Sequence, residues 1–106
     1  MKYNLDLEQI AVELDFDLED VEMLMEVFLE SANENIDSLK VAIDSNNLDE
    51  IYQLSHAIKG SSANLTLMDI SNIAKDIEHN SREKNSINYL DKYTELKTLI
   101  DKIESN

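Results

Sequence analysis

Residues 18–44, LEDVEMLMEVFLESANENIDSLKVAID, decide the fold because apolar side chains recur there at every third or fourth position. These apolar positions are Val21, Met25, Phe28, Ala32, Ile36, Leu39 and Ile43. Such spacing places them along one face of an α-helix and the polar residues along the other face. We therefore predict one long amphipathic helix over residues 18–44, which needs other helices to cover its apolar face.

The same periodicity continues on both sides of this stretch. It predicts a short helix over residues 5–14, followed after the long helix by helices at about 48–63, 67–79 and 87–104. Asn47 with Glu50 forms a capping-box pattern at the start of one helix, and Thr66 with Asp69 is expected to cap the next. The polar run NSREKNS, residues 80–86, is expected to be the longest loop.

Composition supports an all-α protein. The 106 residues include no proline, one glycine and no cysteine, whereas folds rich in turns and strands need more Gly and Pro. We expect residues 1–106 to form a single domain, an antiparallel four-helix bundle of up-down-up-down order with the short N-terminal helix covering one end. Because all four apolar faces close on one core, we expect a monomer, with a dimer that shares a helix as the alternative.

Charge and hydropathy limit the partners. The formal net charge is −14, which disfavours binding to nucleic acid or to an anionic membrane. No 18-residue apolar run occurs, and the N-terminus lacks the apolar run of a signal peptide. We therefore expect a cytoplasmic protein with no nucleic-acid and no membrane partner.

Residues 54–65, LSHAIKGSSANL, hold the only glycine and one of the two histidines. On a helical wheel, the side opposite the apolar residues holds Tyr52, His56, Lys59, Gly60 and Ala63. A glycine inside a helix costs about 1 kcal/mol relative to alanine. Gly60 therefore indicates either close approach of another surface or a packing glycine where two helices cross.

An exposed imidazole beside an ammonium group suits phosphoryl transfer. Near neutral pH a free imidazole is largely in its neutral, nucleophilic form. Phosphoryl transfer depends mainly on positioning and charge compensation, which Lys59 could supply to a phosphoryl group on His56. A carboxylate that accepts a hydrogen bond from one ring nitrogen would fix the tautomer. Our candidate is Glu78, which follows the apolar Ile77 on the predicted helix 67–79.

Residues 56–65, HAIKGSSANL, resemble the signature of histidine-containing phosphotransfer (HPt) domains of bacterial phosphorelays, which reads roughly H-x-L-K-G-S-S-A-x-L-G. The resemblance covers about residues 18–103. It implies that His56 is phosphorylated on Nε2 by the aspartyl phosphate of a receiver domain and passes the group to a second receiver. It also implies that Lys59 stabilises the phosphoryl group, that Gly60 lets the receiver dock closely, and that Glu78 orients the imidazole.

The chain departs from the family pattern in two places: Ser55 replaces a common alanine, and the end of the signature also differs. The glycine that usually ends it is Thr66 in this chain, so we expect a differently built turn, with Asn64 in the left-handed region.

The partners implied by the resemblance are the receiver domains of a hybrid sensor kinase and of response regulators. Tyr52 and Ala63 are expected to join the docking surface, although Tyr52 could instead be a partly buried rim aromatic. A chain with one glycine cannot hold a glycine-rich nucleotide loop, so we expect a stoichiometric carrier and not an enzyme. We expect no cofactor and no metal ligand set here, and Mg²⁺ on the partner receiver.

Two other functions stay open. The chain could be a non-catalytic module that docks receivers without carrying phosphate, or the phosphoacceptor domain of a larger histidine kinase. Because it begins with Met1 and ends soon after the last predicted helix, we expect a stand-alone carrier.

Overall fold

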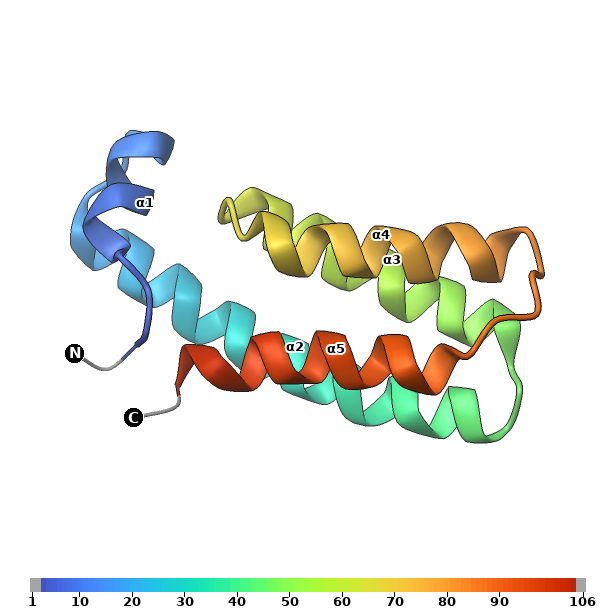
Figure 1. Cartoon of the computed structure of the whole chain (residues 1–106). Helices are drawn as coiled ribbons and strands as arrows, with labels where there is room; N and C mark the ends of the chain where they lie inside the picture. The colour runs from blue at the N-terminus through green and yellow to red at the C-terminus, as the bar shows by residue number, and fades with distance from the viewer. Residues whose placement is uncertain (1–2, 105–106) are drawn as a thin grey trace.

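The computed structural model describes residues 3–104, which form five α-helices and no strand (Figure 1). The helices are α1 (Leu7–Leu14), α2 (Leu18–Asp44), α3 (Leu48–Asn64), α4 (Met68–Arg82) and α5 (Tyr89–Ile103). The all-α fold class predicted from the sequence is confirmed. Within this described part, none of the helices combines the length and apolar character needed to cross a membrane.

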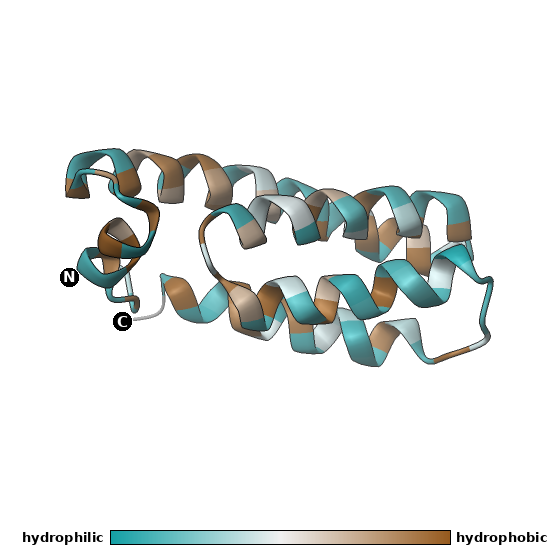
Figure 2. Cartoon of the chain, turned by 90° about the horizontal axis from the view of Figure 1, so that it is seen from above, coloured by the Kyte–Doolittle hydropathy of each residue, from teal (hydrophilic) through white to brown (hydrophobic). Residues whose placement is uncertain are grey.

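The helices α2 to α5 share one core. α3 contacts both α2 and α4, α5 also contacts both, and α1 packs against α2 at one end of the molecule (Figure 1). Hydrophobic and hydrophilic residues alternate along each helix at the spacing that lets one face be buried (Figure 2). The largest fully buried side chains of this core include Met25, Leu39, Ile51, Ile58, Ile77, Leu96 and Ile100.

Four helices end in the same left-handed turn although no glycine is present there. In each turn one residue has a positive φ: Asp15 (55°), Asn46 (54°), Thr66 (60°) and Lys84 (57°). After α3, the backbone N–H of Leu67 donates to the carbonyl of Ser62 and that of Thr66 donates to the carbonyl of Ala63. This pair of bonds is the Schellman pattern, which satisfies carbonyls that the end of a helix leaves free.

Two predictions about helix ends are wrong at the turn between α3 and α4. Thr66 does not cap α4, because it takes the left-handed position of the turn, and α4 begins after Leu67 without a side-chain cap. Asn64 is not left-handed, because α3 continues through it. By contrast, the Oδ1 atom of Asn47 accepts from the backbone N–H of Glu50 at 3.2 Å, so the side-chain cap predicted for α3 is confirmed.

The polar run 80–86 is only partly a loop. Asn80, Ser81 and Arg82 belong to α4, and the buried hydroxyl of Ser81 donates to the carbonyl of Ile77 at 2.8 Å. This additional turn extends α4 beyond its predicted end and leaves residues 83–88 as the connection to α5.

Candidate functional site

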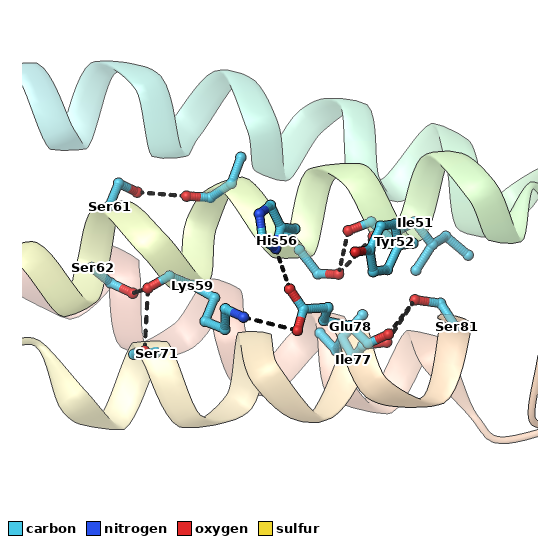
Figure 3. Close-up of polar contacts among 12 residues, drawn as sticks. Ile51, Tyr52, His56, Lys59, Ser61, Ser62, Ser71, Ile77, Glu78 and Ser81 are labelled. Atoms are coloured by element: carbon cyan, nitrogen blue, oxygen red, sulfur yellow. Dashed lines mark hydrogen bonds and ion pairs between the residues drawn. The ribbon is translucent and has the colours of Figure 1, made fainter. Parts of the chain in front are cut away.

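His56 lies in the middle of α3 with its ring largely in solvent. Its side chain is 60% exposed, and its Nδ1 atom forms a hydrogen bond with the Oε2 atom of Glu78 on α4 (Figure 3). The other ring nitrogen, Nε2, has no hydrogen-bond partner among the described residues. The imidazole is therefore held through one nitrogen and accessible through the other.

Glu78 is the buried member of this group. Its side chain is only 7% exposed, and its second oxygen, Oε1, accepts from the Nζ atom of Lys59 at 2.9 Å (Figure 3). Burial raises the pKa of Glu78, but hydrogen bonds from Lys59 and His56 outweigh burial, so its pKa lies below the ordinary value. Glu78 is therefore ionised near neutral pH.

The charge state of Glu78 fixes the tautomer of His56. An ionised carboxylate can only accept hydrogen bonds, so the proton of this contact belongs to Nδ1 of the imidazole. In the neutral ring, the lone pair then lies on Nε2, the accessible nitrogen. The arrangement thus presents a nucleophilic nitrogen to solvent.

Lys59 and Tyr52 flank His56 from the following and the preceding turn of α3. The Lys59 side chain is 30% exposed, so its ammonium group is anchored by Glu78 and also reachable from solvent. The rings of Tyr52 and His56 stack with their centroids 5.9 Å apart and their planes at 22° (Figure 3). Tyr52 is only partly exposed, and its ring lies against one face of the imidazole.

Gly60 and Ala63 are exposed on the same side of α3 as His56. A Cβ atom placed on Gly60 would meet no other atom within 4 Å, so no neighbouring helix requires a glycine there. The alternative that Gly60 is a packing glycine at a helix crossing is therefore wrong. The glycine instead leaves open surface one turn after His56.

Small hydroxyl residues let α3 and α4 pack closely beneath the site. Ser55 and Ser62 on α3 are fully buried, and Ser71 and Ser81 on α4 are nearly so. Ser71 also links the two helices, because its hydroxyl donates to the backbone carbonyl of Lys59 at 3.2 Å (Figure 3). The seven-residue spacing of Ser55 and Ser62 in the sequence indicates that both lie on one face of α3.

The site as a whole can form a covalent bond at Nε2 and compensate an anion attached there. It offers one nucleophile, one ammonium group and one buried carboxylate that holds both. Across residues 3–104, His, Asp and Glu side chains nowhere gather in a group of three or more that could hold a metal ion. The contacts of Glu78 with His56 and Lys59 place a nucleophile beside a positive charge.

Comparison of the chain with known protein families identifies one family. A family model described as the Hpt domain matches residues 23–106, which include α3, α4 and every residue of the site. No curated protein and no solved structure matches the chain.

Proposed function

The chain belongs to the Hpt domain family, and we propose on this basis that it is a phosphohistidine carrier of a phosphorelay. In this proposal His56 accepts a phosphoryl group from the aspartyl phosphate of a receiver domain and passes it to the aspartate of a response-regulator receiver. The observation that carries the proposal is the imidazole of His56, bound through Nδ1 to the buried Glu78 and accessible at Nε2.

The proposed transfer needs no reactant other than His56 and the aspartyl phosphate. The lone pair of Nε2 attacks the phosphorus atom, an N–P bond forms, and the P–O bond to the aspartate breaks, so the aspartate carboxylate leaves with the electron pair. The Nδ1 proton stays on the ring, which makes the phosphorylated imidazole a cation. The carboxylate of Glu78 stabilises that cation, and the ammonium group of Lys59 compensates the phosphoryl oxygens. Onward transfer is the same step in reverse.

The other groups that the transfer requires belong to the partner proteins. We propose that Mg²⁺ is bound by the receiver and that this chain acts stoichiometrically, as a carrier and not as a kinase. In the same proposal α2 to α5 form the up-down-up-down bundle, and the docking surface around His56 includes Tyr52, Gly60 and Ala63.

The direct test is to incubate the protein with a panel of phosphorylated receiver domains and to measure its intact mass. We expect a gain of one phosphoryl group that is labile in acid and stable in alkali, as a phosphoramidate bond requires. A folded protein that gains no mass from any receiver would contradict the carrier function and favour a docking module that carries no phosphate.

We predict that Lys59→Ala still accepts phosphate but does so about tenfold more slowly, because one charge-assisted contact to the phosphoryl group is lost. The measurement is the rate of transfer from a phosphorylated receiver. Lys97→Ala is the matched control. Lys97 pairs with Asp101 on α5, so this substitution removes the same charge outside the site. Equal rates for the two variants would remove Lys59 from the mechanism.

We predict that Gly60→Gln stabilises the protein yet slows transfer from a receiver. The free energy of unfolding should rise by about 0.5–1 kcal/mol, because glutamine is the better helix former and finds open space at this position. Transfer from a receiver should slow because the longer side chain stands on the surface that the receiver must approach. Urea unfolding measures the first effect and transfer kinetics the second. An unchanged transfer rate would exclude Gly60 from the docking surface.

A further inference from the structure

An aromatic ring lies against the imidazole that the proposed function uses. Tyr52 precedes His56 by four residues on α3, and the two rings stack with their centroids 5.9 Å apart and their planes at 22° (Figure 3). Offset stacking at this separation is a favoured geometry for two aromatic rings. The transfer described above uses Glu78 and Lys59 but gives the Tyr52 ring no part in the chemistry.

Phosphorylation changes the charge of the ring that Tyr52 contacts. The Nδ1 proton of His56 stays on the ring, bonded to the carboxylate of Glu78, so the imidazole becomes a cation when Nε2 gains the phosphoryl group. A cation within about 6 Å of an aromatic ring centroid is attracted to the electron-rich face of that ring. A neutral imidazole lacks this attraction. The contact with Tyr52 therefore favours the phosphorylated form of His56 over the unphosphorylated form.

The neighbours of His56 on its own helix include no carboxylate that could balance this cation. The residues three and four positions away on α3 are Tyr52, Gln53, Lys59 and Gly60. From α4, the carboxylate of Glu78 is shared between His56 and the ammonium group of Lys59. A second carboxylate beside the ring would stabilise the cation but would repel the phosphoryl dianion. The face of a neutral aromatic ring attracts the cation without placing a full negative charge beside the phosphoryl group.

We propose that Tyr52 stabilises phosphorylated His56 through the contact of its ring face with the phosphoimidazolium cation, and that it thereby lengthens the lifetime of the phosphorylated carrier. This inference rests on the proposed function and deepens it, because it says how the chain keeps the phosphoryl group between two receivers. Glu78 stabilises the cation at Nδ1, whereas Tyr52 stabilises it from one face of the ring.

Hydrolysis of the phosphorylated chain shows why the contact affects its lifetime. A water oxygen attacks the phosphorus atom, the N–P bond breaks, and its electron pair returns to Nε2. The water protons leave with inorganic phosphate, and the imidazole becomes neutral with its proton still on Nδ1. Because the positive charge of the ring disappears in this step, a contact that stabilises that charge stabilises the reactant more than the transition state and slows the step.

The test varies the electron density of the ring at position 52 while its shape is kept. The variants are Tyr52→Phe, Tyr52→Leu and a chain with pentafluorophenylalanine at position 52, in which fluorine withdraws electron density from the ring face. Each chain is labelled with phosphoramidate, a small donor that needs no docking surface, and the lifetime of phosphorylated His56 is followed by intact mass. The second measurement is the equilibrium constant for transfer from the receiver that labels the wild type fastest.

We expect Tyr52→Leu and pentafluorophenylalanine to lower both the lifetime and the equilibrium constant by about two- to fivefold, the effect of one exposed cation–π contact. Tyr52→Phe keeps the electron-rich ring face and should stay close to the wild type. Tyr93→Leu is the matched control, because Tyr93 is also partly buried but lies on α5 outside the site. It should leave both quantities unchanged.

Three results would overturn the proposal. The first is an equal lifetime and equilibrium constant for the wild type and Tyr52→Leu. The second is a slower transfer in both directions with an unchanged equilibrium constant, which would make Tyr52 a docking residue only, because docking speeds both directions equally. The third is a loss in Tyr52→Phe as large as in Tyr52→Leu, which would assign the effect to the hydroxyl.

Failure of the proposed function gives a different result. A wild-type chain labelled by phosphoramidate but by no receiver would contradict the carrier function. The lifetimes measured after phosphoramidate labelling would still decide whether the ring of Tyr52 stabilises phosphorylated His56.

Discussion

We expect His56→Gln to abolish phosphoryl acceptance and to leave the helical fold intact. A glutamine amide nitrogen has no nucleophilic lone pair, so neither a receiver nor phosphoramidate can form an N–P bond at this position. The fold should survive because the His56 side chain is mostly exposed and takes no part in the core. We expect the free energy of unfolding to change by at most about 1 kcal/mol, since one hydrogen bond to Glu78 is altered.

The experiment measures intact mass after incubation with each donor, together with circular dichroism and urea unfolding. His79→Gln is the control, because His79 is the other histidine and lies exposed on α4. It should accept phosphate as the wild type does. A phosphoryl group on folded His56→Gln would place the acceptor elsewhere, and loss of the group in His79→Gln would identify that residue instead.

The helical class and the exposed position of His56 could be predicted because both follow from periodicity alone. Once Ile58 and its neighbours define the buried side of α3, the wheel places His56 on the opposite side. The spacing of apolar residues in α2 is equally direct, since its buried positions, such as Met25 and Leu39, recur at helical intervals.

The contact between His56 and Glu78 could only be a hypothesis from the sequence. Glu78 follows the fully buried Ile77 by 100° on the helical wheel, so a modest rotation of α4 would turn its carboxylate to solvent. What fixes that rotation is the close packing of α3 on α4 through small residues, including Ser62 and Ser71. Packing of this kind depends on both helices together, so the sequence of either helix by itself does not predict it.

The turn between α3 and α4 could not be predicted from the sequence for a different reason. Local patterns favoured Thr66 as a cap, but the chain must reverse direction there, and this requires one residue with a positive φ. Thr66 takes that conformation despite its branched Cβ, because the two backbone hydrogen bonds of the turn form only with the left-handed residue at this position. The requirement comes from the tertiary fold and overrides the local preference.

Glu78→Ala should lower the rate of phosphoryl acceptance by about 10–100-fold, by analogy with the loss that follows when the partner orienting a metal-bound imidazole is removed. Without the carboxylate, the proton is no longer held on Nδ1, and the cation formed on phosphorylation loses its nearest negative charge. Lys59 also loses the anchor at 2.9 Å that keeps its ammonium group beside the site. The rate is measured with phosphoramidate as well as with a receiver, since the defect lies in the chemistry and should appear with both donors.

Glu83→Ala is the matched control, because Glu83 is an exposed carboxylate just after α4 and should leave both rates unchanged. Glu78→Gln separates hydrogen bonding from charge. The glutamine amide oxygen can still accept a hydrogen bond from Nδ1 of His56, but the neutral amide cannot compensate a cation. The NH₂ group of the glutamine would also face the ammonium group of Lys59. If Glu78→Gln or Glu78→Ala accepted phosphate at the wild-type rate, Glu78 would be only a structural residue.

The pH dependence of stability gives a second readout for Glu78. Its pKa in the folded protein lies below the ordinary value of 4.5, so the folded state binds fewer protons at this carboxyl than the unfolded state does. The stability that it contributes is therefore fully present above pH 4.5 and is lost as the pH falls through the lowered pKa. The difference in unfolding free energy between the wild type and Glu78→Gln should be constant near neutral pH and shrink in acid. A difference that stayed the same in acid would show that Glu78 is not held ionised by Lys59 and His56.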